Sequence, residues 1–363
     1  MKFTTQKEEL LKYLNIVSRL ASTRSTLPIL QNIYLVVNGN NLLIRSTDLE
    51  QTLEVNINGE GESSGAVTIP ARLLTEYLQN NTDKIVTISN DDLIIKINSA
   101  NHDATLRGMA AEDYPTLPEV AYDFTTTMSS VVLSDAINKT VFSSASDETR
   151  PILTGLLFKI EGNNLTIVGT DGYRLAKSVI TIKQGKDSQF IIPKRSLQEL
   201  LRILPLNEEV TLSLAQNQCC AQVGDTKLIT RVIEGNFPAF ESIIPKKHSL
   251  EVAINSQVLL QSLKLASLFS RDSAFSTNLE IKGDNLIITA TSPVLGDNSN
   301  KITLAKKSDT DFKISVNAQY LIDILSVLSG DVLLQFIDQK SPVVVRAHLD
   351  ERYLYLVMPL RGE

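Results

Sequence analysis

The sequence is poor in the residues that mark several protein classes, cysteine above all. It has two cysteines in 363 residues, Cys219 and Cys220. Adjacent cysteines cannot join distant segments, so a secreted protein held by a disulfide framework is excluded. This usage predicts a reducing, cytoplasmic compartment. We interpret the pair as two small residues of one strand that face opposite sides.

Long apolar runs are also missing. No stretch approaches the ~20 consecutive apolar residues of a membrane helix. The charged start MKFTTQKEELLKYL has no apolar core of the kind found in secretory signals. With 43% hydrophobic and 21% charged residues, the chain has an ordinary globular composition, and its length predicts two or three domains. The net charge of -6 argues against indiscriminate DNA binding.

Motifs for metal or phosphate chemistry are absent as well. The three histidines, His102, His248 and His348, show no metal-ligand spacing, and we expect them in loops or at strand ends. No phosphate-binding loop and no dinucleotide-binding glycine turn occurs. We therefore expect no metal and no cofactor.

Two further patterns could suggest catalysis, but neither has the right context. Residues 61–65 match GxSxG, yet a strand follows instead of the helix that a nucleophile elbow needs, so we predict a flexible hairpin loop. Asp48 and Asp171 each follow a strand in a Thr-Asp turn, where aspartate caps backbone N–H groups. We predict no intrinsic catalysis.

What the chain does contain is a threefold internal repeat. GNNLLIRSTD (39–48), GNNLTIVGTD (162–171) and GDNLIITATS (283–292) lie 123 and 121 residues apart. VTIPARLLTEYL (67–78), FIIPKRSLQELL (190–201) and ISVNAQYLIDIL (314–325) keep the same period. A period this long is domain-sized. We predict three domains of one fold, at 1–122, 123–247 and 248–363.

Each repeat has a legible α+β pattern. Leu10, Leu14 and Val17 recur at helical spacing, as do Val258, Leu259 and Leu263 in the third repeat. A hairpin is predicted where NIYLVV and LLIRST flank an Asn-Gly turn. The strand VTIP then leads into the helix ARLLTEYLQ, with Pro70 at its first position. We predict two helices packed on antiparallel strands in each domain.

Positive charge gathers in and beside the predicted helices, although the chain is acidic. Lys12 and Arg19, Arg195 and Arg202, and Lys264 and Arg271 are each seven residues apart, two helical turns along one face. The strands carry much of the acid. This sorting favours a localised electropositive surface; the alternative is an ordinary solvated helix face of mixed charge.

Several segments resemble one known family. Thr170 to Leu175 reads TDGYRL and is similar to the family's TDGHRL, and Val357 to Arg361 reads VMPLR and is similar to its VMPMR ending. The start MKFT and the segments TLPIL (26–30) and TDLE (47–50) are similar too. On these residues the chain resembles, over its whole length, the beta subunit of bacterial DNA polymerase III, the sliding clamp family.

The resemblance implies a ring-forming DNA clamp. Two chains would join head to tail into a ring of six similar domains around duplex DNA, with helices inside and strands outside. Such a ring confers processivity on the replicative polymerase by tethering it to its template. It binds DNA without reading sequence, and it binds the polymerase subunit, the clamp loader and other proteins that carry a clamp-binding motif. The clamp is a non-catalytic, cytoplasmic subunit of the DNA polymerase III holoenzyme.

The family's site residues carry over to positions in this chain. The partner-peptide pocket would comprise Leu153, Thr170, Gly172, Tyr173, Arg174, Leu175, Pro238, Ile243, Phe275, Asn317, Tyr320, Val357, Met358, Pro359, Leu360 and Arg361. Tyr173 stands where histidine is common and Ser242 where arginine is expected, so peptide preference is the feature most open to change.

The same resemblance, together with the charge pattern, implies a set of DNA-facing residues and a set of dimer-interface residues. The DNA-facing residues would be Lys12, Arg19, Arg24, Lys139, Lys194, Arg195, Arg202, Lys264 and Arg271. The dimer interface would place Ala104 and Leu106 of one chain opposite Leu268 and Phe269 of the other. Phe269 is a large apolar residue near a helix end, which a monomer would have little reason to expose. The alternative function is a peptide-binding adaptor that does not encircle DNA.

Overall fold

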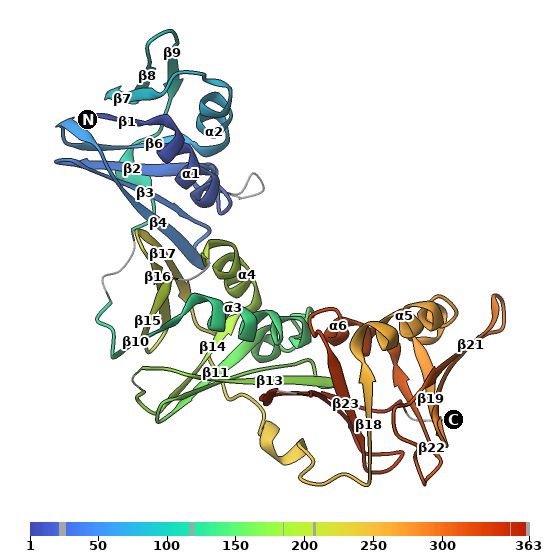
Figure 1. Cartoon of the computed structure of the whole chain (residues 1–363). Helices are drawn as coiled ribbons and strands as arrows, with labels where there is room; N and C mark the ends of the chain where they lie inside the picture. The colour runs from blue at the N-terminus through green and yellow to red at the C-terminus, as the bar shows by residue number, and fades with distance from the viewer. Residues whose placement is uncertain (22–26, 117–119, 184, 206–207, 349, 361–363) are drawn as a thin grey trace. The chain divides into compact units, whose positions relative to one another are not determined.

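The order of helices and strands repeats three times along the chain. In the computed structural model (Figure 1), residues 1–21, 27–116, 120–183, 185–205, 208–348 and 350–360 are described. Each repeat runs strand, helix, a group of antiparallel strands, helix and three more strands. The α+β class and the repeated clamp-type domain are therefore as predicted.

The three repeats have matching elements. The first contains β1 (Lys2–Gln6), α1 (Lys7–Val17), β2 (Asn32–Asn38), β3 (Asn41–Thr47), β4 (Gln51–Asn58), β5 (Glu60–Ser63), β6 (Gly65–Pro70), α2 (Ala71–Asn80), β7 (Ile85–Asp91), β8 (Ile94–Asn98) and β9 (Asp103–Arg107). The second contains β10 (Phe124–Ser129), α3 (Ser130–Asn138), β11 (Gly155–Glu161), β12 (Asn164–Thr170), β13 (Arg174–Thr181), β14 (Ser188–Pro193), α4 (Lys194–Ile203), β15 (Glu209–Ala215), β16 (Gln218–Val223) and β17 (Thr226–Arg231). The third contains β18 (Leu250–Asn255), α5 (Ser256–Ser267), β19 (Ser276–Lys282), β20 (Asn285–Ser292), β21 (Gly296–Thr303), β22 (Phe312–Asn317), α6 (Ala318–Leu325), β23 (Asp331–Phe336), β24 (Val343–Ala347) and β25 (Asp350–Val357).

Local sequence explains most of these elements. The predicted hairpin forms between β2 and β3, with Gly39 at φ 59° in its turn, a conformation that glycine adopts without strain. In α1, Leu10, Leu14 and Val17 are fully buried, as their helical spacing predicts. In the third repeat, α5 and α6 lie side by side on one face of the strands (Figure 1), above a core that includes Leu263 and Leu321.

The described strands form four antiparallel sheets, and two of these cross from one repeat into the next. One eight-stranded sheet has the order β10-β15-β16-β17-β4-β3-β2-β6, and the other β14-β11-β12-β13-β25-β24-β23-β18. A five-stranded sheet, β5-β1-β7-β8-β9, belongs to the first repeat, and a four-stranded sheet, β21-β20-β19-β22, to the third. The repeats thus share sheets through the pairs β4–β17 and β13–β25.

Because the second repeat contributes strands to both shared sheets, it is divided between two compact units. Unit 1 comprises 1–131 and 199–232, and unit 2 comprises 132–198 and 233–363. The three domain boundaries predicted above describe repeats of sequence, whereas these units describe packing. Within the described residues, none of the helices has the length and apolar character needed to cross a membrane.

Some local predictions are wrong. Helix α1 ends at Val17 and α5 ends at Ser267, so Arg19 and Arg271 lie beyond the helices that were meant to carry them. Val258 lies on α5 but is 45% exposed and faces away from the core. Pro70 is the last residue of β6 and the N-cap of α2 rather than its first helical residue.

The stretch at 61–65 is also not the flexible loop that was predicted. Residues 60–63 form β5, which pairs with β1, and Gly65 begins β6. Sheet pairing at an edge therefore overrides the loop-like composition of this stretch. The rejection of a nucleophile elbow is unaffected, since no helix follows.

Candidate functional site

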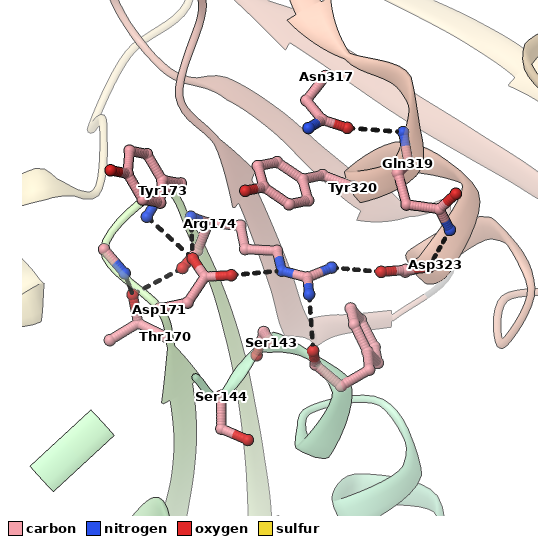
Figure 2. Close-up of polar contacts among 12 residues, drawn as sticks. Ser143, Ser144, Thr170, Asp171, Tyr173, Arg174, Asn317, Gln319, Tyr320 and Asp323 are labelled. Carbon is pink, nitrogen blue, oxygen red and sulfur yellow. Dashed lines mark hydrogen bonds and ion pairs between the residues drawn. The ribbon is translucent and has the colours of Figure 1, made fainter. Parts of the chain in front are cut away.

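The centre of the site is the turn that joins β12 to β13 in unit 2, shown in Figure 2. Asp171 accepts hydrogen bonds at Oδ1 from the backbone N–H groups of Tyr173 (2.9 Å) and Arg174 (3.1 Å). The hydroxyl of Thr170 donates to the carbonyl of Arg174 (2.6 Å) and accepts from the N–H of Gly172 (3.1 Å). Gly172 has φ 91°, which favours glycine. The predicted capping role of Asp171 is confirmed, and the turn holds Tyr173 outward, 62% exposed.

Arg174 is held on three sides. Its Nε donates to Asp171 Oδ2 (2.9 Å), its NH1 group to Asp323 Oδ2 (2.5 Å) and its NH2 group to the carbonyl of Phe142 (2.9 Å), as Figure 2 shows. The side chain is only 11% exposed. Two carboxylates therefore balance one buried guanidinium, the condition under which a buried charge is tolerated. Asp323 lies on α6, so this cluster ties the second repeat to the third.

Aromatic rings enclose the same guanidinium. Its Cζ lies 4.6 Å from the ring centre of Tyr320 and 5.7 Å from that of Phe142, within cation–π range. The Tyr355 hydroxyl donates to the carbonyl of Tyr320 (2.8 Å) and holds the start of α6 in place. Burial alone would lower the pKa of Arg174, but Tyr355, Asp323 and Asp171 together raise it, so its charge is permanent.

The N-terminus of α6 is fixed by its own polar residues. Asn317 is the N-cap and accepts at Oδ1 from the N–H of Gln319 (2.8 Å). The amide of Gln319 donates to Asp323 Oδ1 (2.7 Å), so both oxygens of Asp323 are bonded. Figure 2 shows Tyr320 and Asp323 of α6 extending toward Arg174, while Asn317, the last residue of β22, is bonded to the start of the helix.

Phe275 stands beside α6 in an unusual backbone conformation. Ala274 and Phe275 have φ 53° and 55°, values that residues with a side chain rarely adopt. The carbonyl of Phe275 accepts from the N–H of Ala318 (2.9 Å), and its own N–H donates to Ser270 (2.7 Å). Such strain persists only where the surroundings fix it, and it is typical of binding sites.

The C-terminal segment forms one wall of the site. The N–H of Met358 donates to the carbonyl of Tyr173 (2.9 Å), and that of Leu360 to the carbonyl of Ser315 (2.8 Å). Met358 is 39% exposed, whereas Val357 is fully buried. Residues 358–360 belong to no strand.

Apolar side chains form the floor beside this wall. Leu175, Val344 and Leu356 belong to one buried cluster with Phe240, and Phe237 packs against it. Leu153 and Leu175 are 7% and 1% exposed, and we call them the floor of the predicted pocket. Ile243 is 47% exposed and Pro238 is also exposed, and we call them its rim. The hydroxyl of Ser242 donates to the carbonyl of Ala239 and stays within its own turn (2.9 Å). The described residues of the predicted pocket thus lie in unit 2, and Arg361 is outside the described residues.

Sequence reasoning missed the residues that position Arg174. Asp323, Phe142 and Gln319 were not selected, and Asp171 was assigned a capping role alone. A signal existed for Asp323, which lies three residues after Tyr320 and therefore on the same face of α6. Phe142 acts through its carbonyl, which no side-chain pattern can reveal. Val344 and Leu356 are further floor residues that were not selected.

The predicted DNA-facing residues differ in their surroundings. Lys12, Arg19, Arg195, Lys264 and Arg271 are exposed. Arg24 lies outside the described residues. Arg202 pairs with Glu199 (2.5 Å) but remains 57% exposed.

Lys139 and Lys194 are less available to a ligand. Lys139 is 15% exposed and lies 2.6 Å from Asp135 and 3.6 Å from Asp350. Lys194 is half-buried, and burial, followed by the nearby charge of Arg174, lowers its pKa. Of the two, Lys139 already has its charge balanced, so we expect it to contribute least to DNA binding.

Two of the predicted interface residues lie on an edge strand, and the other two directly follow helix α5. Ala104 and Leu106 are half-buried on β9, the edge strand of the five-stranded sheet. Leu268, just after α5, is 46% exposed. Phe269 is half-buried and packs against the core of the third repeat, and its place in the interface stays a prediction.

The described residues offer no metal centre. No group of three or more His, Cys, Asp or Glu side chains among them could hold an ion. Both cysteines lie buried on β16, and burial raises the pKa of each thiol, which makes them unreactive.

Three repeats of one order of helices and strands, with sheets shared between consecutive repeats, define a clamp-type protein. Family models of the DNA polymerase III beta subunit match 1–118 (N-terminal domain), 127–239 (central domain) and 241–361 (C-terminal domain). The chain belongs to this family, the bacterial beta sliding clamps.

Relatives match over nearly the full length. The beta sliding clamp of Staphylococcus epidermidis is 28% identical over 99% of both chains, and that of Halalkalibacterium halodurans is 29% identical over 99% of this chain and all of its own. The DNA polymerase III subunit beta of Pseudomonas aeruginosa has a TM-score of 0.96, and the sliding clamp of Bacillus subtilis 0.94, each 28% identical with full coverage of both chains.

Proposed function

We propose that the chain is a DNA sliding clamp: a head-to-tail homodimeric ring that encircles duplex DNA and confers processivity on the replicative polymerase. The observation that carries this proposal is the threefold order of elements, which matches solved sliding clamps over the whole chain. The role is mechanical, so we propose no catalysis by the chain itself, and a cytoplasmic site of action beside the chromosome. The repeats at 1–122, 123–247 and 248–363 are the proposed domains.

Two sheet edges support the head-to-tail contact. On β9 the exposed residues are Asp103, Thr105 and Arg107, and on β21 the exposed residues include Asp297, Ser299 and Lys301. The stretches 103–107 and 297–301 each begin with an acid and end with a base. Antiparallel pairing of β9 in one chain with β21 in the other therefore sets opposite charges against each other at both ends, whereas parallel pairing opposes like charges.

Exposed apolar residues near these edges fit the same contact. Leu73 on α2 is 47% exposed, and Leu265 and Leu268 at the end of α5 are 51% and 46% exposed. Apolar side chains at a sheet edge favour association, and burying them stabilises the pair of chains. We propose that they cover one another when the ring closes.

The peptide cleft is the proposed docking point for the polymerase and the clamp loader. The apolar floor under Leu175, the rim at Pro238, Ile243 and Met358, and the polar turn at Thr170 to Arg174 suit a short motif with leucine and phenylalanine anchors. Since Arg174 is already bonded to two carboxylates, we propose that it shapes the cleft and offers its edge to the peptide.

Loading onto circular DNA tests the ring. Clamps loaded by the clamp loader onto nicked circular DNA should remain at high salt and leave after the DNA is linearised. Binding by counterion release alone would be lost at high salt from both substrates. Equal loss from circular and linear DNA would instead support the peptide-binding adaptor.

Charge reversal tests the interface. Arg107→Glu should shift sedimentation toward a folded monomer, and Asp297→Arg in the same chain should restore the dimer. Leu268→Asp, at an exposed position, should also give monomer. A dimer unaffected by all three changes would place the interface elsewhere.

A further inference from the structure

A small basic hollow lies in unit 2 beside the proposed peptide cleft. It has a volume of about 220 Å³. Its lining comes from the loop Pro245, Lys246, Lys247 and His248, and from Gln335, Ile337, Val344 and Arg346 of the β23–β24 region. The family resemblance assigned no role to these residues.

The hollow has an excess of positive charge. Among the described residues, no ion pair joins Lys246, Lys247 or Arg346 to a carboxylate. Arg346 Nε donates to Gln335 Oε1 (3.2 Å), a neutral partner. Beside the hollow, Glu251 accepts from the Gln335 amide (2.7 Å) and lies 3.7 Å from His248 Nε2. One carboxylate thus stands against three cations.

The hollow adjoins the floor of the cleft. Val344 lines the hollow and belongs to the same buried cluster as Leu175 and Leu356. On the sheet, Val344 is the direct partner of Leu356, two residues before Met358. Residues of one strand that alternate share a face, so Arg346 lies on the same sheet face as Val344.

The chain itself links the two sites. Ile243, on the rim of the cleft, precedes Lys246 by three residues, a span of at most about 10 Å. Glu241 lies nearby in the short helix η5 (Phe240–Ile243), but Lys159 pairs with it (3.0 Å). The charge of Glu241 is therefore already balanced.

We propose that the hollow binds an acidic flank of the partner peptide, a short run of Asp and Glu beside its apolar anchors. This inference rests on the peptide docking proposed above and adds a second determinant to it. Charge complementarity identifies the ligand. The three cations Lys246, Lys247 and Arg346 lie next to the proposed apolar cleft and favour a peptide flank with carboxylates over a neutral or basic flank. The flank lies at the rim in water, so its contribution is modest and depends on salt.

Fluorescence polarisation with two matched peptides tests the proposal. Both carry the same leucine and phenylalanine anchors from the host polymerase subunit, and one adds three acidic residues where the other has Ser-Gly-Ser; each flank is placed first at one end and then at the other. The acidic peptide should bind about three- to tenfold more tightly at low salt, with the advantage below twofold at 0.5 M salt.

Paired lysine variants locate the effect. The double variant Lys246→Gln with Lys247→Gln should bind the acidic peptide no more tightly than the neutral peptide. Its affinity for the neutral peptide should equal that of the wild type. The matched control is Lys306→Gln with Lys307→Gln, an adjacent exposed pair in the same unit, which should retain the advantage.

Three results are distinguishable. Equal binding of the two peptides would overturn the inference while leaving the cleft intact. Failure of both peptides to bind would overturn the peptide docking itself. If the double variant of Lys246 and Lys247 instead lost its retention on DNA while binding both peptides as the wild type does, the hollow would be a site for DNA phosphates, and the proposal would be overturned.

Discussion

The turn at 47–51 and the turn at 170–174 are built with the same hydrogen bonds. Asp48 Oδ1 accepts from the N–H groups of Glu50 and Gln51, as Asp171 Oδ1 does from those of Tyr173 and Arg174. Both threonine hydroxyls donate to the carbonyl four residues on. The hydrogen-bonded backbone of this turn is therefore a feature that both repeats share, and it is not specific to the candidate site.

The two turns differ in the side chain that leaves them. Gln51 reaches Asp48 Oδ2 at 3.4 Å, and its own Oε1 is buried without a partner. Arg174 reaches Asp171 at 2.9 Å and continues to Asp323 in the next repeat. This position is glutamine in the first repeat, where the side chain bonds within its own turn. It is arginine in the second repeat, where the side chain also bonds to the third repeat beside the proposed cleft.

The substitution Arg174→Gln should have the largest effect on this difference, because it gives the second turn the glutamine that the first turn has at Gln51. Asp323 would lose its cation, and we expect unit 2 to lose about 2–4 kcal/mol of stability, since removing one partner of a buried ion pair leaves the other uncompensated. Peptide affinity should fall at least tenfold. Denaturant unfolding followed by circular dichroism and peptide titration measure the two effects; wild-type values for both would show that Arg174 does not organise the cleft.

The chain end is the second difference between the two turns. The N–H of Arg231 bonds to Glu50 as that of Met358 bonds to Tyr173, but the chain runs on after Arg231. Deleting 358–363 removes the wall of the cleft and two backbone hydrogen bonds. The truncated chain should remain a dimer that closes around DNA and should bind a polymerase-derived peptide at least tenfold more weakly, about 1.4 kcal/mol. Unchanged affinity in a dimeric truncation would move the peptide site elsewhere.

Alanine at each aspartate compares the turns directly. Asp48→Ala should cost about 1–2 kcal/mol by removing backbone caps. Asp171→Ala should cost more, since it also removes a partner of Arg174. Hydrogen exchange should show lost protection at β4 in the first variant and at β13 in the second. Only the second should weaken peptide binding, and equal weakening in both would contradict the distinction.

The smallest expected effect concerns Tyr114, which corresponds to Phe237 in the second repeat. Tyr114 stacks on Tyr34, and burial raises its pKa to about 12. An unfolded tyrosine titrates near pH 10, so the folded state holds its proton more tightly between pH 10 and 12, and stability falls as the pH rises through that window. Tyr114→Phe should change stability by less than about 1 kcal/mol at pH 7 and should flatten the decline above pH 10. Identical alkaline unfolding curves for both proteins would contradict this.

Local features could be predicted from sequence because they depend on near neighbours. The hairpin of β2 and β3, the strand-to-helix step at Pro193 and the capping by Asp171 follow from turn residues and periodicity. The ends of α1 and α5 did not follow, because the spacing of Arg19 and Arg271 continues past the last helical turn.

Long-range pairing left no local signal. The contact of Arg174 with Asp323 joins residues 149 apart, and the pairing of β13 with β25 joins residues that are further apart still, such as Arg174 with Val357. Each partner looks ordinary in its own segment, a turn arginine and a helix aspartate. The family resemblance supplied the members of the cleft, while the geometry supplied the reason that Arg174 belongs there.

The shared sheets limit how such a chain can be rearranged. Excising the second repeat would cut β17 away from β4 and β13 away from β25, exposing two unpaired strands that invite aggregation. Swapping a single repeat with a relative's would require both neighbouring strand registers to match. We therefore expect recombination breakpoints within this chain to be selected against. The three repeats, once fused, would then have been inherited together and have diverged together.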